Sequence, residues 1–300
     1  MNSKIKSVGV IGLGSMGMGA AKSCINAGLD VYGIDLNPEA LKEISEFGAK
    51  GISQSPLEFT EKLDSVLILV VNAKQVNSVL FDSGLASALK PETAIMVSAT
   101  ISADDAKNIE EKLKLHQLIM LDAPVSGGAA KAAIGEMTVM ASGPQEAFDK
   151  LQPVLDATAI KVYKIGEDIG LGSTVKIIHQ LLAGVHIAAG AEAMALAARA
   201  DIPLDLMYDV VTHAAGNSWM FENRMKHVVD GDYSPKSMVD IFVKDLGLVA
   251  DTAQKLDFPL PLSSSALEMF TKASNAGFGK EDDSAVIKIF EGIKLPGAGE

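Results

Sequence analysis

Short apolar runs alternate with amphipathic segments through the first half of the chain. The run from Val66 to Val71 is apolar without interruption, as expected of a parallel strand that is covered on both faces. Strands are predicted over 7–11, 30–34, 66–71, 94–98, 118–122, 137–141 and 161–163. Helices are predicted over 15–27, 38–47, 56–62, 74–80, 103–114 and 144–155. This alternation predicts an open, doubly wound parallel sheet.

The pattern changes after Gly166, where strand-like runs disappear and long helical patterns continue to the end of the chain. Helices are predicted over 170–199, 205–213, 218–228, 236–255, 262–276 and 281–291. We therefore expect an α/β domain over 1–166 and an all-α helical domain over 167–300. The segment 170–199 is apolar on nearly all sides, so it is expected to be a central helix that is buried all round.

A glycine-rich turn joins the first predicted strand to the first predicted helix. It consists of Gly12, Leu13, Gly14, Ser15, Met16 and Gly17. Such a turn directs backbone N–H groups and a helix N-terminus at one point, which suits a pyrophosphate. Asp35 ends the second predicted strand, where a Rossmann-type dinucleotide-binding domain places an acid on the adenosine ribose. The alternative is a structural glycine turn beside a solvated aspartate.

Asp35 also bears on the choice of cofactor. Its carboxylate can accept hydrogen bonds from ribose hydroxyls and would repel a 2′-phosphate, and no Arg follows within residues 36–39. The sequence therefore predicts NAD rather than NADP. Further cofactor contacts are expected at Leu36 and at residues that follow later strands, Val71, Asn72 and Thr100.

Charge and composition narrow the function. The chain has 300 residues and a net charge of −12, which argues against nucleic-acid binding because phosphate contacts need clustered Lys and Arg. Cys24 is the single cysteine, so an internal disulfide framework is excluded. No His, Cys and carboxylate cluster has metal-ligand spacing, so no metal is expected. With neither a secretory segment nor a predicted membrane span, a cytoplasmic location is expected.

Three polar side chains stand together on the apolar helix 170–199. Lys176, His179 and Gln180 occur at i, i+3 and i+4 and therefore share one face. A buried ammonium needs a partner, which could be a structural carboxylate or an anionic substrate with which Lys176 exchanges a proton. His179 could equally be a packed helix histidine.

A second candidate segment follows the strand predicted over 118–122. Ser126, Gly127 and Gly128 offer a hydroxyl and backbone N–H groups that suit a carboxylate, although a plain loop is an equal alternative from residue chemistry alone. By spacing alone, Lys244 and Asp245 would be a surface charge pair of little energetic value.

Four motifs in order resemble those of the β-hydroxyacid dehydrogenases, and the resemblance covers essentially the whole chain. They are the segments 12–17, 122–128, 170–176 and 244–248. The resemblance implies that Lys176 is the catalytic lysine and that Ser126, Gly127 and Gly128 hold the substrate carboxylate. It also implies that Thr100 and Lys244 contact the dinucleotide, and that the enzyme is a homodimer or homotetramer.

The segments 176–182 and 213–224 are similar to the branch of this family that oxidises L-threonate. Most of the family has Asn at one or both of the positions held here by His179 and Gln180. These polar side chains favour a small, anionic polyhydroxy acid as substrate, with L-threonate oxidised to 2-oxo-tetronate. The alternatives are a tartronate semialdehyde reductase, a 3-hydroxyisobutyrate dehydrogenase, and a regulatory module that binds NAD without turnover.

Overall fold

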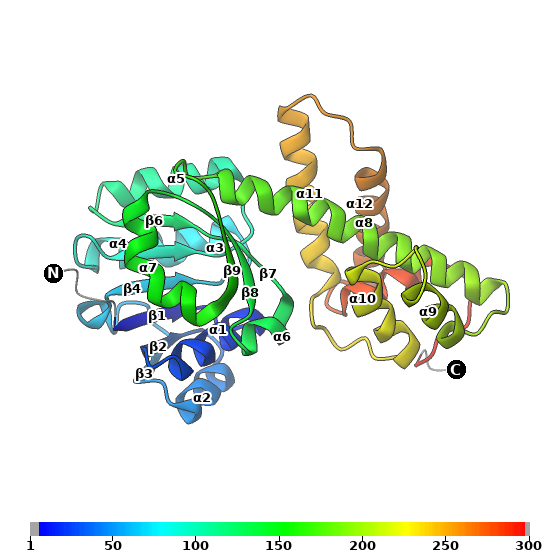
Figure 1. The fold of residues 1–300 in the computed structure, drawn as a ribbon, viewed down its shortest axis with the longest axis horizontal. Coiled ribbons are helices and arrows are strands. Elements are labelled where there is room, and N and C mark those ends of the chain that lie inside the picture. Colours follow the sequence, from blue (N-terminus) through cyan, green and yellow to red (C-terminus); the bar gives the residue numbers. More distant parts are fainter. Residues whose placement is uncertain (1–5, 298–300) are drawn as a thin grey trace. The chain divides into compact units, whose positions relative to one another are not determined.

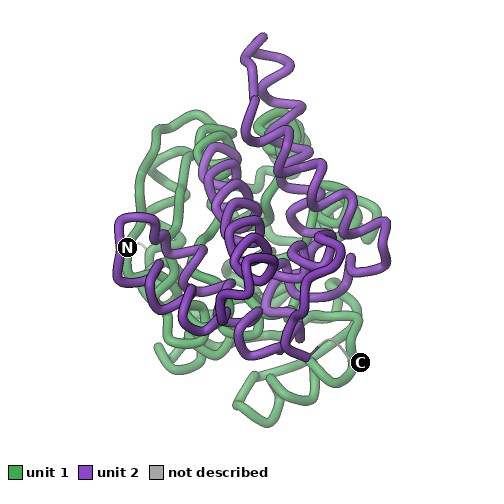
Figure 2. The backbone as a smooth tube through the Cα atoms, turned by 90° about the vertical axis from the view of Figure 1, so that its right-hand side faces the viewer, with its two compact units in different colours: residues 1–176 green, residues 177–300 purple. Residues whose placement is uncertain are grey.

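The computed structural model describes residues 6–297 and divides into two compact units, residues 1–176 and 177–300 (Figures 1 and 2). The division falls inside helix α8 (Leu171–Arg199), whereas the sequence pattern predicts a boundary before this helix, at residue 166. The fold class predicted from the sequence is confirmed, because a largely parallel sheet with flanking helices precedes an all-helical unit.

The first unit is built on one nine-stranded sheet (Figure 1). Its strands are β1 (Ser7–Ile11), β2 (Asp30–Ile34), β3 (Gly51–Ser53), β4 (Ser65–Ile68), β5 (Ala94–Val97), β6 (Ile119–Asp122), β7 (Val125–Ser126), β8 (Met137–Ser142) and β9 (Ala159–Gly166). The order is β3-β2-β1-β4-β5-β6-β8-β7, with β9 also paired to β8. Strands β1 to β6 pair in parallel. Strands β2 and β3 lie on one side of β1, and β4, β5 and β6 lie on the other, so the strand order reverses between β1 and β4. Sheets of this kind bind ligands at such a reversal point.

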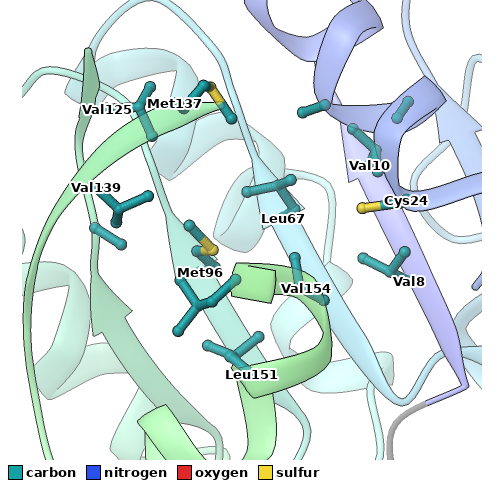
Figure 3. Close-up of a cluster of buried hydrophobic side chains, with 14 of the residues drawn as sticks. Val8, Val10, Cys24, Leu67, Met96, Val125, Met137, Val139, Leu151 and Val154 are labelled. Carbon is teal, nitrogen blue, oxygen red and sulfur yellow. The ribbon is translucent and has the colours of Figure 1, made fainter. Parts of the chain in front are cut away.

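Helices cover both faces of this sheet. One face is covered by α1 (Ser15–Asn26), α2 (Pro38–Phe47), α6 (Gly128–Ala133) and α7 (Gln145–Thr158). The other is covered by α3 (Ala73–Asn77), the π-helical turn η2 (Ser78–Asp82), α4 (Leu85–Ala88) and α5 (Ala103–Lys114). Figure 3 shows part of the first of these cores, a single cluster that includes Val8 and Val10 of β1, Cys24 of α1, and Leu151 and Val154 of α7. Burial raises the pKa of the Cys24 thiol to about 12, as expected of a packed rather than a reactive cysteine.

The second unit is helical. It contains the larger part of α8, then α9 (Leu204–Thr212), α10 (Trp219–Asp230), α11 (Val239–Lys255), α12 (Pro261–Ala273), the π-helical turn η3 (Ser274–Phe278) and the 3₁₀ helix η4 (Asp283–Ile289). Its core brings α8 residues such as Ile187 and Met194 together with Met225 of α10, Leu246 of α11 and Phe270 of α12.

Several predicted elements differ from the observed ones. Residues 56–62 form turns and the short 3₁₀ helix η1 (Thr60–Lys62) instead of an α-helix, because the side chains of Ser53 and Ser55 accept hydrogen bonds from nearby backbone N–H groups. The predicted helix over 281–291 is the 3₁₀ helix η4, which begins where the Asp282 side chain accepts from the N–H of Ser284. The short elements β3, β7, α4 and α6 were not predicted from the sequence.

Helix α8 is not buried all round, so that prediction is wrong. Three apolar side chains of this helix, Ile178, Leu182 and Leu196, are 58%, 54% and 69% exposed. Within residues 6–297, α8 has the length and composition needed to cross a membrane, yet half of its most apolar window is buried inside the protein. Its buried side chains belong to the core of the second unit, so α8 is a core helix with one uncovered apolar face.

A buried contact between an arginine and an aspartate in the second unit makes stability depend on pH. Arg224 Nε of α10 lies 2.6 Å from Oδ1 of Asp283, whose neighbour Asp282 is also buried. Burial, opposed by the Arg224 guanidinium, raises the pKa of Asp283 from 3.8 to about 7. The folded protein therefore keeps a proton that the unfolded chain releases, and this contribution to stability is lost as the pH rises from about 4 to about 7.

We expect Asp283→Asn to reduce the fall in unfolding free energy over that pH range, measured by urea denaturation at several pH values. The exposed carboxylate of Asp251 on α11 supplies the control, Asp251→Asn. An unchanged pH profile in Asp283→Asn would contradict a protonated Asp283 in the folded state.

Candidate active site

The glycine turn between β1 and α1 requires glycine at two positions and leaves open space at a third. Gly12 has φ +91°, and a Cβ there would lie 2.6 Å from the carbonyl oxygen of Leu69. A Cβ on Gly17 would lie 1.7 Å from the carbonyl oxygen of Gly12. A Cβ on Gly14 would meet nothing within 4 Å. The turn is thus tightly packed at Gly12 and Gly17 and accessible at Gly14, which fits a dinucleotide pyrophosphate.

Asp35 lies directly beside this turn. Its Oδ2 accepts a hydrogen bond of 2.6 Å from the N–H of Leu13, and its Oδ1 accepts one of 2.7 Å from the N–H of Asn37. The end of β2 is therefore tied to the glycine turn, and the carboxylate stays half-buried. The next side chain, Leu36, is 81% exposed. Acid, turn and exposed apolar side chain together fit the adenosine half of a dinucleotide.

The ends of β4 and β5 supply the other predicted cofactor residues of the first unit. Val71 is exposed, and its N–H donates to Oε1 of Gln75 at 2.8 Å. The side chain of Asn72 caps α3 by accepting from the N–H of Gln75 at 2.9 Å. Thr100 follows β5 and is half-buried. Because β1, β4 and β5 are parallel neighbours, these residues lie at the same edge of the sheet as the glycine turn.

The segment Ser126–Gly128 links β7 to α6. Gly127 and Gly128 have φ values of +129° and +68°, so both have backbone conformations that favour glycine. A Cβ on Gly127 would lie 2.7 Å from the Cβ of Lys131, whereas a Cβ on Gly128 would meet nothing within 4 Å. The backbone at Gly128 is therefore open to a ligand.

Asp122, at the end of β6, holds the start of α8. Its carboxylate accepts from the N–H groups of Gly170 and Ser173 at 3.0 and 2.9 Å, and from the Ser173 hydroxyl at 2.7 Å. The hydroxyl of Ser142 donates to it at 3.4 Å and accepts from the N–H of Gly172. Burial raises the pKa of Asp122, and the hydrogen bonds from Ser173 oppose that rise.

Lys176 lies one turn beyond Ser173 on α8 and is 6% exposed. Its helix is fixed at this point by the contacts of Asp122, so the first turns of α8 have a defined position relative to the sheet of the same unit. A nearly buried ammonium on an anchored turn is suited to meet an anionic substrate and to exchange a proton with it.

Four polar side chains of the second unit form a connected series. Lys244 Nζ lies 2.6 Å from Oδ1 of Asp245, and Oδ2 of Asp245 accepts from Nε2 of Gln180 at 2.6 Å. Gln180 Oε1 lies 3.0 Å from Nδ1 of His179. Asp245 is 2% exposed, so the interpretation of Lys244 and Asp245 as a surface pair is wrong.

Within each unit, the structure thus brings predicted site residues together. The glycine turn, Asp35 and the ends of β4 and β5 share one sheet edge, and His179 and Gln180 are linked to Lys244 through Asp245. Two roles were not found from the sequence, namely the anchoring of α8 by Asp122 and the bond between Asp245 and Gln180. Among residues 6–297, no group of His, Cys, Asp or Glu is placed to hold a metal ion.

Comparison with known proteins decides the family. A family model described as the NAD-binding domain of 6-phosphogluconate dehydrogenase matches residues 7–166, and the NAD-binding model of NADP-dependent 3-hydroxyisobutyrate dehydrogenase matches residues 170–290. The chain belongs to the β-hydroxyacid dehydrogenase family. It is an NAD-binding dehydrogenase, and the resemblance expected from the four motifs is confirmed.

Two curated members of this family are L-threonate dehydrogenases. The protein of Pectobacterium atrosepticum is 74% identical over 97% of this chain and 96% of its own length, and that of Haemophilus influenzae is 70% identical over 100% of both. A crystal structure from Salmonella typhimurium described as 3-hydroxyisobutyrate dehydrogenase has a TM-score of 0.92 and 69% identity, and the match covers 95% of this chain and 99% of that one. The names of these relatives therefore indicate two different substrates, L-threonate and 3-hydroxyisobutyrate.

We expect Asp35→Asn to raise KM for NAD and to narrow the preference for NAD over NADP by about tenfold, because the repulsion of a 2′-phosphate is lost while the acceptor for the Leu13 N–H remains. Comparing kcat/KM for the two cofactors tests this. Asp30→Asn, at the start of the same strand, is the control. A wild-type preference for NADP would contradict the role of Asp35.

Proposed function

We propose that this protein oxidises a secondary alcohol of a small polyhydroxy acid, L-threonate, to 2-oxo-tetronate with NAD. The observation that carries the proposal is Lys176, a nearly buried lysine on the turn of α8 that Asp122 anchors. The L-threonate dehydrogenases that share 70–74% identity with the chain support the same substrate.

The first unit supplies most of the cofactor contacts in this proposal. The turn Gly12–Gly17 receives the pyrophosphate, Asp35 and Leu36 the adenosine, and Val71, Asn72 and Thr100 the nicotinamide half. Lys244 completes the set from α11. Bound NAD supplies the acceptor for the hydride that leaves the alcohol carbon.

Lys176 accepts the hydroxyl proton as the carbonyl forms, directly or through water, and returns it when the reaction runs in reverse. Ser126 with the N–H groups of Gly127 and Gly128 holds the carboxylate. His179 and Gln180 complete the substrate site. In an alternative role, Lys176 acts as an electrostatic anchor while water transfers the proton.

The substrate alternatives are 3-hydroxyisobutyrate and tartronate semialdehyde. The similarity to the Salmonella typhimurium structure described as 3-hydroxyisobutyrate dehydrogenase favours 3-hydroxyisobutyrate. The two polar side chains at 179 and 180 favour a more hydroxylated acid, because a substrate hydroxyl can hydrogen-bond to a polar side chain and a methyl group cannot.

We also propose that the enzyme is a cytoplasmic homodimer or homotetramer. The support is the uncovered apolar face of α8, where Ile178, Leu182 and Leu196 are more than half exposed. Sedimentation or light scattering of the purified protein tests the oligomeric state.

The substrate test follows NAD reduction at 340 nm with L-threonate, D-threonate, both erythronates, D-glycerate and 3-hydroxyisobutyrate. Selective turnover of L-threonate is the expected result. Turnover of glycerate or 3-hydroxyisobutyrate alone would overturn the substrate. NAD binding without any turnover would favour the regulatory module.

A further inference from the structure

We infer that Asp245 orients the amide of Gln180 and thereby places the proton of neutral His179 on Nδ1, so that Nε2 accepts a hydrogen bond from a substrate hydroxyl. Asp245 is then a positioning residue, and His179 is the residue that hydrogen-bonds to the substrate hydroxyl. This inference rests on the proposed function, because it assumes a polyhydroxy acid as substrate.

The first step concerns the amide of Gln180. Asp245 is buried, and the ammonium of Lys244 lies 2.6 Å from its Oδ1, so the oxygens of this carboxylate are placed to accept hydrogen bonds. The Gln180 atom 2.6 Å from Oδ2 must therefore be the nitrogen, Nε2. The orientation of this amide is decided by chemistry, although oxygen and nitrogen are similar in shape.

The second step concerns the ring of His179. With Nε2 of Gln180 directed at Asp245, the amide oxygen faces Nδ1 of His179 at 3.0 Å. An amide oxygen accepts and cannot donate, so Nδ1 must carry a hydrogen. A neutral imidazole has one donor and one acceptor nitrogen, and its acceptor is then Nε2.

The third step places this acceptor relative to the reacting alcohol. His179 follows Lys176 by three residues on α8, so their Cβ atoms are neighbours on one helix face, about 5–6 Å apart. The His179 side chain is exposed, so a ligand can reach it. A substrate whose alcohol reaches Lys176 carries its neighbouring hydroxyl within about one helical turn of that point. A hydroxyl donates to Nε2, whereas the methyl group of 3-hydroxyisobutyrate cannot.

The series also changes the role of Gln180. From the sequence, its polar side chain was expected to favour a polyhydroxy acid as substrate. In the structure both ends of this amide bond to protein groups, Asp245 at one end and His179 at the other. Gln180 therefore transmits the orientation set by α11 to a side chain on α8.

The test uses proton-detected nitrogen NMR of the full-length protein labelled with ¹⁵N-histidine. The chain has five histidines, and the spectrum of His179→Asn identifies the signals of His179. We expect the proton on Nδ1 in the wild-type protein and a shift of population toward Nε2–H in Asp245→Asn, whose amide can also donate to Gln180 and so reverse its orientation. A predominant Nε2–H form in the wild-type protein would overturn the inference.

Kinetics supply the second readout. In Asp245→Asn and His179→Phe, we expect the ratio of kcat/KM for L-threonate to that for 3-hydroxyisobutyrate to fall about tenfold or more. The matched controls are Asp251→Asn on α11 and His186→Asn on α8, which should leave the ratio unchanged. An unchanged ratio in folded Asp245→Asn, judged by its thermal unfolding, would overturn the positioning role.

The two failures can be told apart. A wild-type protein with Nδ1–H at His179 but without L-threonate turnover would overturn the proposed function and the hydroxyl contact, while leaving the tautomer intact. A wild-type protein that oxidises L-threonate but has Nε2–H at His179 would overturn this inference alone.

Discussion

Lys176→Ala is expected to lower kcat for oxidation of the hydroxy acid by about 10²–10⁴-fold, the range associated with loss of a positioned acid–base group. Lys176 is 6% exposed on an anchored turn of α8, so a surface lysine cannot take its place. The dissociation constant for NAD should change by less than about threefold, because the proposal assigns NAD binding mainly to the glycine turn and Asp35, which are tied to each other and lie far from Lys176 in the sequence. Steady-state kinetics and calorimetric titration with NAD measure the two effects.

Two further variants sharpen this prediction. Lys272→Ala on α12 removes an exposed lysine and should leave kcat unchanged. Lys176→Arg retains the positive charge but cannot lose its proton near neutral pH. Near-normal turnover in Lys176→Ala would remove the lysine from the mechanism, whereas substantial turnover in Lys176→Arg would favour the electrostatic role over proton transfer.

Asp122→Ala is expected to lower the free energy of unfolding by about 3 kcal/mol or more, because it leaves several buried donors without an acceptor. The hydrogen bonds that hold Gly170 and Ser173 at the start of α8 disappear, so kcat should fall together with stability. Denaturant unfolding and steady-state kinetics on the same preparation measure both.

The control for this variant is Asp149→Ala on α7, an exposed aspartate whose loss should change stability by less than about 0.5 kcal/mol. If Asp122→Ala unfolded like the wild-type protein, the anchoring of α8 would not depend on this carboxylate. If it were destabilised but kept its kcat, the position of Lys176 would be set by other contacts.

The local parts of the fold could be predicted from the sequence. The bounds of β1, β2, α2 and α5 agree with prediction, because their strand patterns, caps and turns lie within a few residues of each other. The π-helical turn η2 and the 3₁₀ helix η4 could not, because an apolar period of about 3.6 residues does not distinguish an α-helix from its tighter and wider relatives.

The site divides in the same way. The glycine turn and Asp35 could be predicted from their spacing in the sequence, because a single short strand–helix–strand unit brings them together in the dinucleotide fold. The contacts Asp122–Ser173 and Gln180–Asp245 join residues that are 51 and 65 positions apart in the sequence. The hydrophobic periodicity of the sequence does not predict contacts between residues so far apart. The sequence contained a hint, since apolar residues flank the pair Lys244–Asp245 on both sides, but the adjacent lysine made Asp245 resemble a surface charge.

The three glycines of the turn look equivalent in the sequence motif, but the structure shows that they are not required for the same reason. Gly12 and Gly17 are required by the packing of the fold itself, whereas a Cβ on Gly14 would meet nothing within 4 Å, so the fold alone does not require glycine there. In a descendant that gave up its dinucleotide but kept its fold, the middle glycine would be free to drift while the outer two persisted. The residue at that one position is therefore a marker by which relatives that retain the cofactor can be sorted from those that have lost it.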